Sequence, residues 1–352
     1  MKAMTKKILA RSRGPVLMTF LVILPIPGCY YVQAVRGHFE IMHSREPIAE
    51  VIADETSPDA LRKRLAMVQD ARDFAVEELL LDDNESYRSY ADLGRDYVVW
   101  NVFAAPEFSL APKTWCFPVA GCVAYRGYFN EDAARRKARQ LREDGYDVFV
   151  GGVSAYSTLG RFADPVLNTM MRWSDVQLIT TIFHELAHQK LYVKDETAFN
   201  ESFATAVADI GIRRWLDKRK DTAGITSIEH DRQLRDSMMR LIDDTKRELT
   251  ALYESRSPVD AKRAGKRMLF DALTAALRDL FDKTGVDADS YLAQPLNNAR
   301  LASFGLYEGY QQAFRNIFAD CSERLDCFYE RAAKLAALGH EERTMRLQQL
   351  SN

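Results

Sequence analysis

Two histidines four residues apart constrain this chain more than any other feature of its sequence. His184 and His188 flank Glu185-Leu-Ala, and the chain has only six histidines in all. On an α-helix, residues four apart lie on one face, so two imidazoles there can bind one metal ion. Glu185 directly follows the first histidine, so its carboxylate reaches a metal-bound water rather than the metal. The apolar residues that would bury such a helix are Ile179, Ile182, Phe183, Leu186 and Leu191.

A third ligand is expected from the segment that follows. Catalytic zinc takes three protein ligands and leaves one position open for water. Asp195 and Thr197 interrupt the helical pattern, and Glu201 then lies in the first turn of a second helix that Thr197 can cap. If that helix folds back antiparallel, one Zn²⁺ can be held by His184, His188 and Glu201. The alternative is that Glu201 is a solvated acid, which the helix dipole favours at this position.

These two segments resemble the gluzincin class of zinc peptidases. His184-Glu-Leu-Ala-His-Gln189 followed by Asn200-Glu-Ser-Phe-Ala204 is similar to the HExxH and Asn-Glu-x-x-Ala pattern of that class. Two departures matter. The distance to Glu201 is shorter than in thermolysin or in the large gluzincin aminopeptidases, and the Gly-Ala-Met-Glu-Asn motif with which those aminopeptidases bind the substrate amine does not occur.

The chain as a whole is similar to a family of bacterial predicted aminopeptidases, which are usually lipoproteins. Besides the zinc motif and the N-terminus, the resemblance is carried by Phe117–Gly121, Tyr125–Phe129, Ala155–Gly160 and Asn297-Asn298. It implies gluzincin-like catalytic helices and the removal of residues from the amino end of a peptide substrate. The aminopeptidase activity is implied by the resemblance alone.

The ligand set predicts a mechanism. Zinc would lower the pKa of its bound water, and Glu185 would take a proton from that water and pass it to the leaving amine. The oxyanion formed in the reaction needs a hydrogen-bond donor beside the metal, and tyrosine often serves in gluzincins. Tyr156 and Tyr307 are the candidates, although each can equally be an ordinary half-buried tyrosine.

Two further features of the site region are weaker. Thr205 and Asp209 lie on the same helix face as Glu201, so either could hydrogen-bond a zinc ligand, or the face could simply be solvated. The strand expected after Gly121 could pair with an extended peptide by strand addition.

The first 28 residues are typical of a lipoprotein signal peptide. Basic residues precede the apolar run Val16–Ile26, which is shorter than the roughly 20 residues of a spanning helix. The run ends in Ile26-Pro-Gly-Cys29, which resembles a lipobox and makes Cys29 the acylated N-terminus of the mature chain. A plain signal peptide or an uncleaved anchor are the alternatives. We expect a lipid-anchored protein of the cell envelope that faces the periplasm, on the outer rather than the inner membrane because Tyr30 follows the cysteine.

The cysteines agree with that compartment. Apart from Cys29, the four that remain form two local pairs, Cys116 with Cys122 and Cys321 with Cys327. In an oxidising compartment each pair can close a disulfide. Free thiols are the alternative, and neither pair has the spacing of a zinc knuckle.

The hydrophobic pattern predicts an α+β fold that is predominantly α-helical, with a small mixed β-sheet. We expect an N-terminal helical region over 29–110 that includes a buried helix at Tyr87–Phe103, followed by a zinc peptidase domain over 111–352. Within that domain the small sheet would span 111–155, with a helix at Glu131–Glu143 capped by Asn130. The catalytic helices would span 174–216 and the C-terminal helices 220–352, the last of them holding Tyr307 and Phe314.

Composition excludes some partners and leaves three functions open. The net charge is −2, so no overall field recruits nucleic acid. The expected function is zinc-dependent peptide-bond hydrolysis, as an aminopeptidase acting on peptides in the cell envelope. The alternatives are a zinc endopeptidase of envelope proteins and a non-catalytic envelope lipoprotein. The intact set of ligands together with Glu185 argues against the last.

Overall fold

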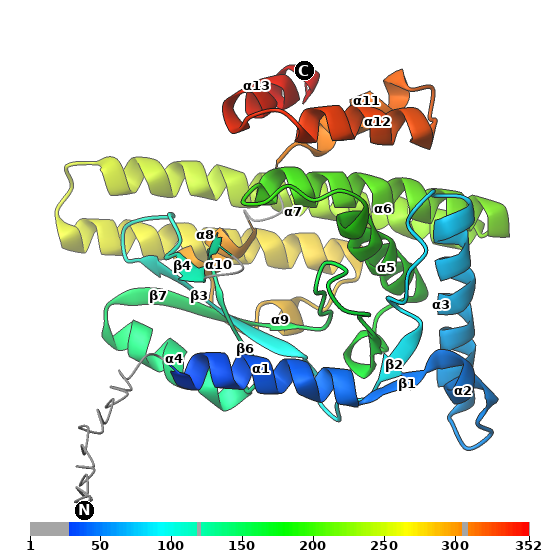
Figure 1. Ribbon diagram of the computed structural model, residues 1–352. Coiled ribbons are helices and arrows are strands. Elements are labelled where there is room, and N and C mark those ends of the chain that lie inside the picture. Colours follow the sequence, from blue (N-terminus) through cyan, green and yellow to red (C-terminus); the bar gives the residue numbers. More distant parts are fainter. Residues whose placement is uncertain (1–27, 118–120, 305–308, 352) are drawn as a thin grey trace, which may run out of the picture.

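The computed structural model describes residues 28–117, 121–304 and 309–351, and over these ranges the fold is α+β and mostly helical (Figure 1). The helices are α1 (Gly28–His43), α2 (Ile48–Ala53), α3 (Asp59–Glu77), α4 (Glu131–Glu143), α5 (Asp175–Lys190), α6 (Thr197–Arg219), α7 (Thr222–Glu254), α8 (Val259–Thr284), α9 (Ala288–Tyr291), α10 (Asn298–Phe304), α11 (Gln311–Asp320), α12 (Leu325–Ala336) and α13 (His340–Ser351). The strands are β1 (Arg45–Pro47), β2 (Ser89–Ala91), β3 (Val99–Pro106), β4 (Trp115–Phe117), β5 (Gly121–Val123), β6 (Arg126–Tyr128), β7 (Tyr146–Val153) and β8 (Val166–Leu167).

The helices surround the strands in groups. α7 and α8 form a long hairpin, α5 and α6 pack against each other and against α3, and α11 joins the C-terminal helices to α6. α1 runs along the side of the molecule opposite the C-terminal helices, at the bottom of Figure 1. The largest hydrophobic core lies between α3, α5, α6 and the C-terminal helices. The α5–α6 pair is therefore packed from two sides, which fixes the position of the side chains it carries.

The strands form three small sheets. In the first, β3 lies between β6 and β7 and is antiparallel to both; α4 packs on this sheet. In the second, β2 pairs antiparallel with β1 and parallel with β8. The third is the hairpin of β4 and β5. β3 precedes residue 111, whereas its partners β6 and β7 follow that residue, so backbone hydrogen bonds join the two predicted domains. The boundaries of these domains stay a prediction.

The prediction of a buried helix at Tyr87–Phe103 is wrong. That stretch contains β2 and the first half of β3. Residues Val102 to Ala105 are all buried, because β3 is central in its sheet and packs on both faces. A strand buried on both faces loses the alternation of apolar and polar residues that would reveal it, whereas its β-branched and aromatic residues favour a strand.

Most of the helix predictions are confirmed. α4 spans Glu131–Glu143, and the Asn130 side chain accepts a hydrogen bond from the Ala133 N–H at 2.9 Å. α6 begins at Thr197 rather than after it, without a side-chain cap. The prediction of one last helix that holds both Tyr307 and Phe314 is wrong, because the C-terminal part contains the separate helices α10 to α13. Phe314 lies in α11, and Tyr307 lies outside the described residues.

The N-terminal and cysteine predictions have different outcomes. Residues 1–27 lie outside the described part of the chain, and α1 begins at Gly28. Within the described residues, no helix is long and apolar enough to cross a membrane. Cys116 and Cys122 face each other across β4 and β5 and are joined by a disulfide, and a second disulfide joins Cys321 to Cys327 between α11 and α12. The pairing is therefore the one the sequence predicts.

Close packing of α5 on α6 gives a first prediction. A Cβ atom added to Gly211 of α6 would lie 2.6 Å from Leu79 Cδ1 and 2.8 Å from Phe183 Cδ2. We expect Gly211→Ala to lower the free energy of unfolding by about 1–3 kcal/mol, because the helices must move apart to accept the methyl group. Gly339→Ala is the control, since nothing lies within 4 Å of that added atom. Chemical denaturation measures both, and equal stability of the two variants would contradict the close contact.

Candidate metal centre

Helix α5 directs both histidines of the motif to one point. Ser174 fixes its N-terminus by accepting a hydrogen bond from the Gln177 backbone N–H at 3.1 Å. His184 and His188 lie on consecutive turns, with their Nε2 atoms 3.1 Å apart and their ring planes at 87°. The side chain of His188 is only 5% exposed and that of His184 19%. Two imidazole nitrogens therefore converge where little water reaches them.

The turn between α5 and α6 brings a carboxylate to the same point. Asn200 is buried, and its side chain accepts a hydrogen bond from the Val193 N–H at 2.8 Å and donates one to the Val193 carbonyl at 2.7 Å. These two bonds close the turn and fix the direction of the next side chain. Glu201 then places Oε2 at 3.3 Å from His184 Nε2 and Oε1 at 3.5 Å from His188 Nε2.

The spacing of these atoms fits a tetrahedral metal ion. Ligands about 2.0–2.1 Å from a zinc ion at tetrahedral angles lie about 3.3–3.4 Å from one another. The two nitrogens are 3.1 Å apart, and each lies 3.3 or 3.5 Å from a different oxygen of the Glu201 carboxylate. His184, His188 and Glu201 are the cluster of potential ligands that the described part of the chain brings together. The residues named from the sequence thus form a possible metal site.

The protonation states also suit a cation. Burial and the neighbouring His184 lower the pKa of His188 to about 4, so its ring is neutral at pH 7. Burial would raise the pKa of Glu201, yet a hydrogen bond from His184 and the charges of His188 and His184 hold it below its usual value. Burial would lower the pKa of His184, but Glu201 and Glu185 raise it. A bound cation would take the place of the proton that those carboxylates otherwise attract.

Asn200 therefore supports a prediction that the sequence motif alone does not. We expect Asn200→Ala to lower the free energy of unfolding by about 2–3 kcal/mol, because the Val193 N–H and carbonyl both lose their buried partner. Metal affinity should fall as well, since Glu201 loses its fixed direction. Denaturation and metal titration measure the two effects. Asn316→Ala, which removes hydrogen bonds to Leu350 and Gln312 outside the ligand cluster, should leave metal affinity unchanged.

Glu185 lies beside the ligands but is buried in a different environment. Burial raises the pKa of its carboxyl, while the charge of His184 and a hydrogen bond with Ser157 lower it, and the net shift is upward. Ser157 belongs to a loop that is fastened by Asp164, a fully buried carboxylate that accepts hydrogen bonds from the Thr158 N–H and Oγ1 at 2.8 Å each. A raised pKa brings a glutamate closer to the pH at which it can both accept and donate a proton.

Of the two predicted tyrosines, the structure describes only Tyr156. The Tyr156 hydroxyl lies 3.2 Å from Nδ1 of His38, within hydrogen-bonding distance, so it faces α1. Burial raises the pKa of Tyr156 to about 12. Tyr307 lies outside the described residues. The role proposed for these two side chains in stabilising an oxyanion stays a prediction.

Two other tyrosines, which were not predicted from the sequence, lie close enough to the site for its carboxylates to raise their pKa. Burial raises the pKa of Tyr125, and the charges of Glu201 and Glu185 raise it further. Burial also raises the pKa of Tyr192, with smaller contributions from Asp195 and Glu201, and its ring centroid is 6.4 Å from that of His188. Two weak indications of these residues were present in the sequence. Tyr125 lies in the Tyr125–Phe129 segment that carries part of the family resemblance, and Tyr192 directly follows the helix of the histidine motif.

The remaining predictions for this region have mixed outcomes. No hydrogen bond between described residues joins Thr205 or Asp209 to a ligand, although the charge of Asp209 raises the pKa of His184. Gly121 has a left-handed φ of +70°, and a Cβ there would lie 2.5 Å from Asp195 Oδ1. The β4–β5 hairpin therefore abuts the α5–α6 turn. Pairing of β5 with a peptide stays a prediction.

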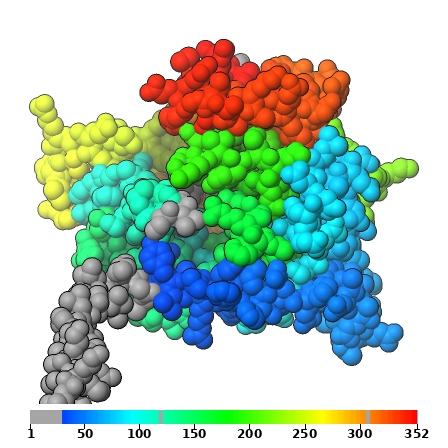
Figure 2. Space-filling model, viewed as in Figure 1, coloured from blue at the N-terminus to red at the C-terminus, as the bar shows by residue number. Residues whose placement is uncertain are grey.

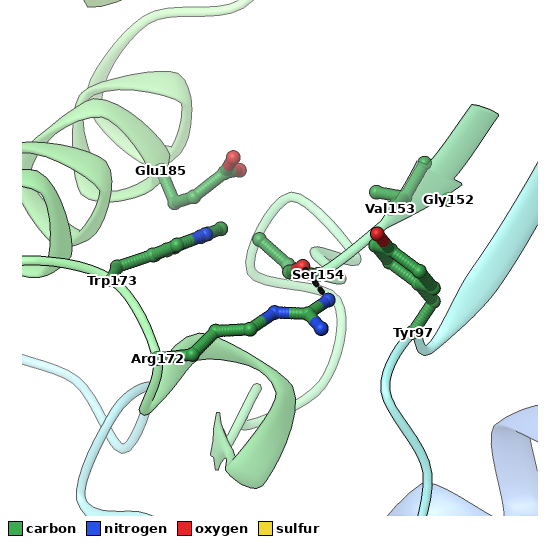
Figure 3. Close-up of a pocket in the computed structure, with 8 residues that line it drawn as sticks. Tyr97, Gly152, Val153, Ser154, Arg172, Trp173 and Glu185 are labelled. Carbon is green, nitrogen blue, oxygen red and sulfur yellow. Dashed lines mark hydrogen bonds between the residues drawn. The ribbon is translucent and has the colours of Figure 1, made fainter. Parts of the chain in front are cut away.

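Glu185 also lines a cavity beside the ligand cluster. The cavity has a volume of about 530 Å³ and lies between α5, the end of β7 and the segment before α5 (Figure 3). The space-filling view shows the surface hollowed between α1 and the α5–α6 region (Figure 2). A volume of this size is within the range of about 300–1,000 Å³ that is typical of small-ligand pockets.

Comparison with known proteins identifies a family for the chain. No curated protein and no solved structure matches the chain. A family model described as "Putative aminopeptidase" matches residues 29–347, which include α5, α6 and the segments that line the cavity. Because the match covers nearly the whole chain, the protein belongs to this aminopeptidase family.

Proposed function

We propose that the protein is a zinc-dependent aminopeptidase of the gluzincin type. The observation that carries the proposal is the convergence of His184, His188 and Glu201 at separations of 3.1 to 3.5 Å, with Glu185 on the adjacent helix position. Two histidines, a glutamate and an open position form a ligand set used by catalytic zinc in peptidases. The family supplies the class of substrate, which is a peptide.

The residues of the chain have distinct roles in this mechanism. His184, His188 and Glu201 would hold the metal, which when bound makes water more acidic and polarises a carbonyl. Glu185 accepts the proton of the attacking water and delivers it to the nitrogen of the leaving amine. Ser157 lies close enough to the Glu185 carboxylate to lower its pKa.

Tyr125 and Tyr192 are the hydroxyl groups that we assign to the developing negative charge. Both lie close enough to Glu201 for its charge to add to the effect of burial on their pKa, and a tyrosine hydroxyl, protonated at neutral pH, can donate a hydrogen bond. Tyr125→Phe or Tyr192→Phe should lower kcat more than it changes KM. If neither does so, the donor is another group.

Comparison of free and blocked peptides tests the exopeptidase assignment. The wild-type chain should release the first residue from peptides with a free α-amine and should not cleave their N-acetylated counterparts. Cleavage of acetylated peptides at internal bonds would replace this assignment by an endopeptidase. Absence of hydrolysis with either series, from protein that contains zinc, would leave the chain as a non-catalytic envelope protein.

We further propose that the chain is anchored in the cell envelope by lipid on Cys29 and faces the periplasm, with the outer membrane as its site. The proposal is supported by the lipobox-like Ile26-Pro-Gly-Cys29 and by two disulfides. It is also supported by the exposed apolar face of α1, just after Cys29, where Val32, Val35 and Phe39 are 67%, 54% and 55% exposed. Such a stripe suits contact with a lipid surface.

Intact mass of the membrane-extracted protein tests the anchor. The chain should begin at Cys29 and carry the added mass of acyl groups, and Cys29→Ser should abolish both. A wild-type protein that begins at Met1, or that begins near residue 29 without acyl groups, would contradict lipidation.

A further inference from the structure

The cavity beside Glu185 contains a second charged group that the mechanism does not use. Arg172 lies at its other end, and Figure 3 shows the guanidinium and the Glu185 carboxylate on either side of the cavity, with Trp173 and Tyr97 as aromatic walls. Among the residues that line the cavity, Arg172 and Glu185 are the only charged ones. A substrate group that reaches the end opposite Glu185 therefore meets a positive charge.

Arg172 is held in place by neutral groups. Its Nη2 donates a hydrogen bond to Ser154 Oγ at 3.1 Å and another to the Asp96 carbonyl. Its Cζ lies 4.3 Å from the centroid of the Tyr97 ring, in a cation–π contact. The ring can approach because residue 152 is glycine, where a Cβ would lie 2.4 Å from it. These contacts preorganise the guanidinium and leave its charge to a ligand, because both hydrogen-bond acceptors and the ring are uncharged.

Asp96, the acid that the structure pairs with Arg172, is a weak partner. An Asp96 carboxylate oxygen lies 3.9 Å from Nη1, which is beyond hydrogen-bonding distance, and the Asp96 side chain is 89% exposed. Exposed ion pairs of this kind contribute little to the free energy of folding. The Arg172 side chain itself is 40% exposed, so a ligand can reach it.

From this arrangement we propose that Arg172 binds a carboxylate of the peptide substrate and makes the enzyme selective for peptides that carry one. A planar guanidinium can donate two parallel hydrogen bonds to a carboxylate, which is stronger than a contact between neutral groups. The carboxylate can come from an acidic side chain or from the C-terminus of a short peptide. The inference rests on the proposed peptidase function, because the bound peptide must also reach Glu185.

The test is a matched set of tetrapeptides with a free α-amine. Each has Asp or Asn at position two, three or four and is made with a free or an amidated C-terminus. The wild type should hydrolyse at least one carboxylate-bearing peptide with a kcat/KM about 10- to 100-fold above that of its Asn, amidated counterpart. Preference for the free C-terminus or for one Asp position identifies the source of the carboxylate.

Variants separate recognition from structure. Arg172→Gln should bring the selectivity ratio close to one, and Arg172→Lys should give an intermediate ratio because the charge remains without the planar fork. Loss of Arg172 for structural reasons would lower kcat/KM for every peptide equally and leave the ratio unchanged. Arg135→Gln removes an exposed positive charge on α4 and should also leave the ratio unchanged. A wild-type ratio near one, or a ratio that Arg172→Gln does not alter, would overturn the proposal.

Binding distinguishes failure of this inference from failure of the proposed function. In a Glu185→Gln chain, calorimetry with the same peptides should show tighter binding of the carboxylate-bearing ones, and adding Arg172→Gln should remove the difference. Carboxylate binding that depends on Arg172 without hydrolysis by the wild type would keep the binding site and overturn the peptidase. Hydrolysis with no dependence on a carboxylate would do the reverse.

Discussion

Replacing Glu185 by glutamine should lower kcat for peptide hydrolysis by about 10²- to 10⁴-fold while metal binding is retained, because the amide has nearly the same shape but cannot accept a proton. The structure places Glu185 next to His184 on α5 but outside the His184–His188–Glu201 cluster. Its loss should therefore leave all three potential ligands in position. Metal content of the purified variant and steady-state kinetics measure the two halves of this expectation.

A control with the same change of charge is available on α12. Glu330 is exposed there and pairs with Lys334 at 2.6 Å, so Glu330→Gln should leave both kcat and metal content unchanged. Loss of metal from Glu185→Gln would make Glu185 a ligand rather than a base. Retention of wild-type kcat would mean that another group moves the proton.

Replacing Glu201 by alanine should remove both the metal and the activity. The carboxylate lies 3.3 and 3.5 Å from the two imidazole nitrogens, and two histidines alone leave a cation with too few protein ligands. Loss of a group that only orients a ligand costs about 10- to 100-fold in metal affinity, so loss of a ligand should cost more. Peptide hydrolysis should fall with metal content, and a chelator should reproduce the loss in the wild type until zinc is added back.

The same helix offers the control for this variant. Asp217 lies near the far end of α6, is 54% exposed and pairs with Arg213. Asp217→Asn should bind zinc as the wild type does. If Glu201→Ala still bound one zinc per chain with wild-type affinity, the carboxylate would be a neighbour of the site and not part of it.

The cluster of potential metal ligands could be predicted from the sequence because its geometry is local. The i, i+4 spacing of His184 and His188 fixes their relation on any helix. Glu201 required one further assumption, that the next helix turns back directly. The residue that enforces this, Asn200, was visible in the motif, but its hydrogen bonds to Val193 could be seen only in the folded chain.

The strand β3 and the walls of the cavity could not be predicted, because they depend on contacts between residues that lie far apart in the sequence. β3 pairs with β6 and β7, which follow it in the sequence, and burial on both faces removes the pattern that marks a strand. The cavity combines Tyr97, Gly152, Arg172 and Glu185 from separate segments. The contact between the Tyr156 hydroxyl and His38, more than a hundred positions earlier in the chain, was likewise not visible in the sequence. Such contacts depend on tertiary packing rather than on local periodicity.

Anomalous X-ray diffraction from crystals of the protein as purified, recorded on both sides of the zinc absorption edge, tests the metal centre most directly. One peak per chain should appear only above the edge, at about 2.0–2.1 Å from His184 Nε2, His188 Nε2 and a Glu201 oxygen. Crystals that lack such a peak even after zinc is added, or that place it away from these three side chains, would contradict the zinc site and the peptidase mechanism that depends on it.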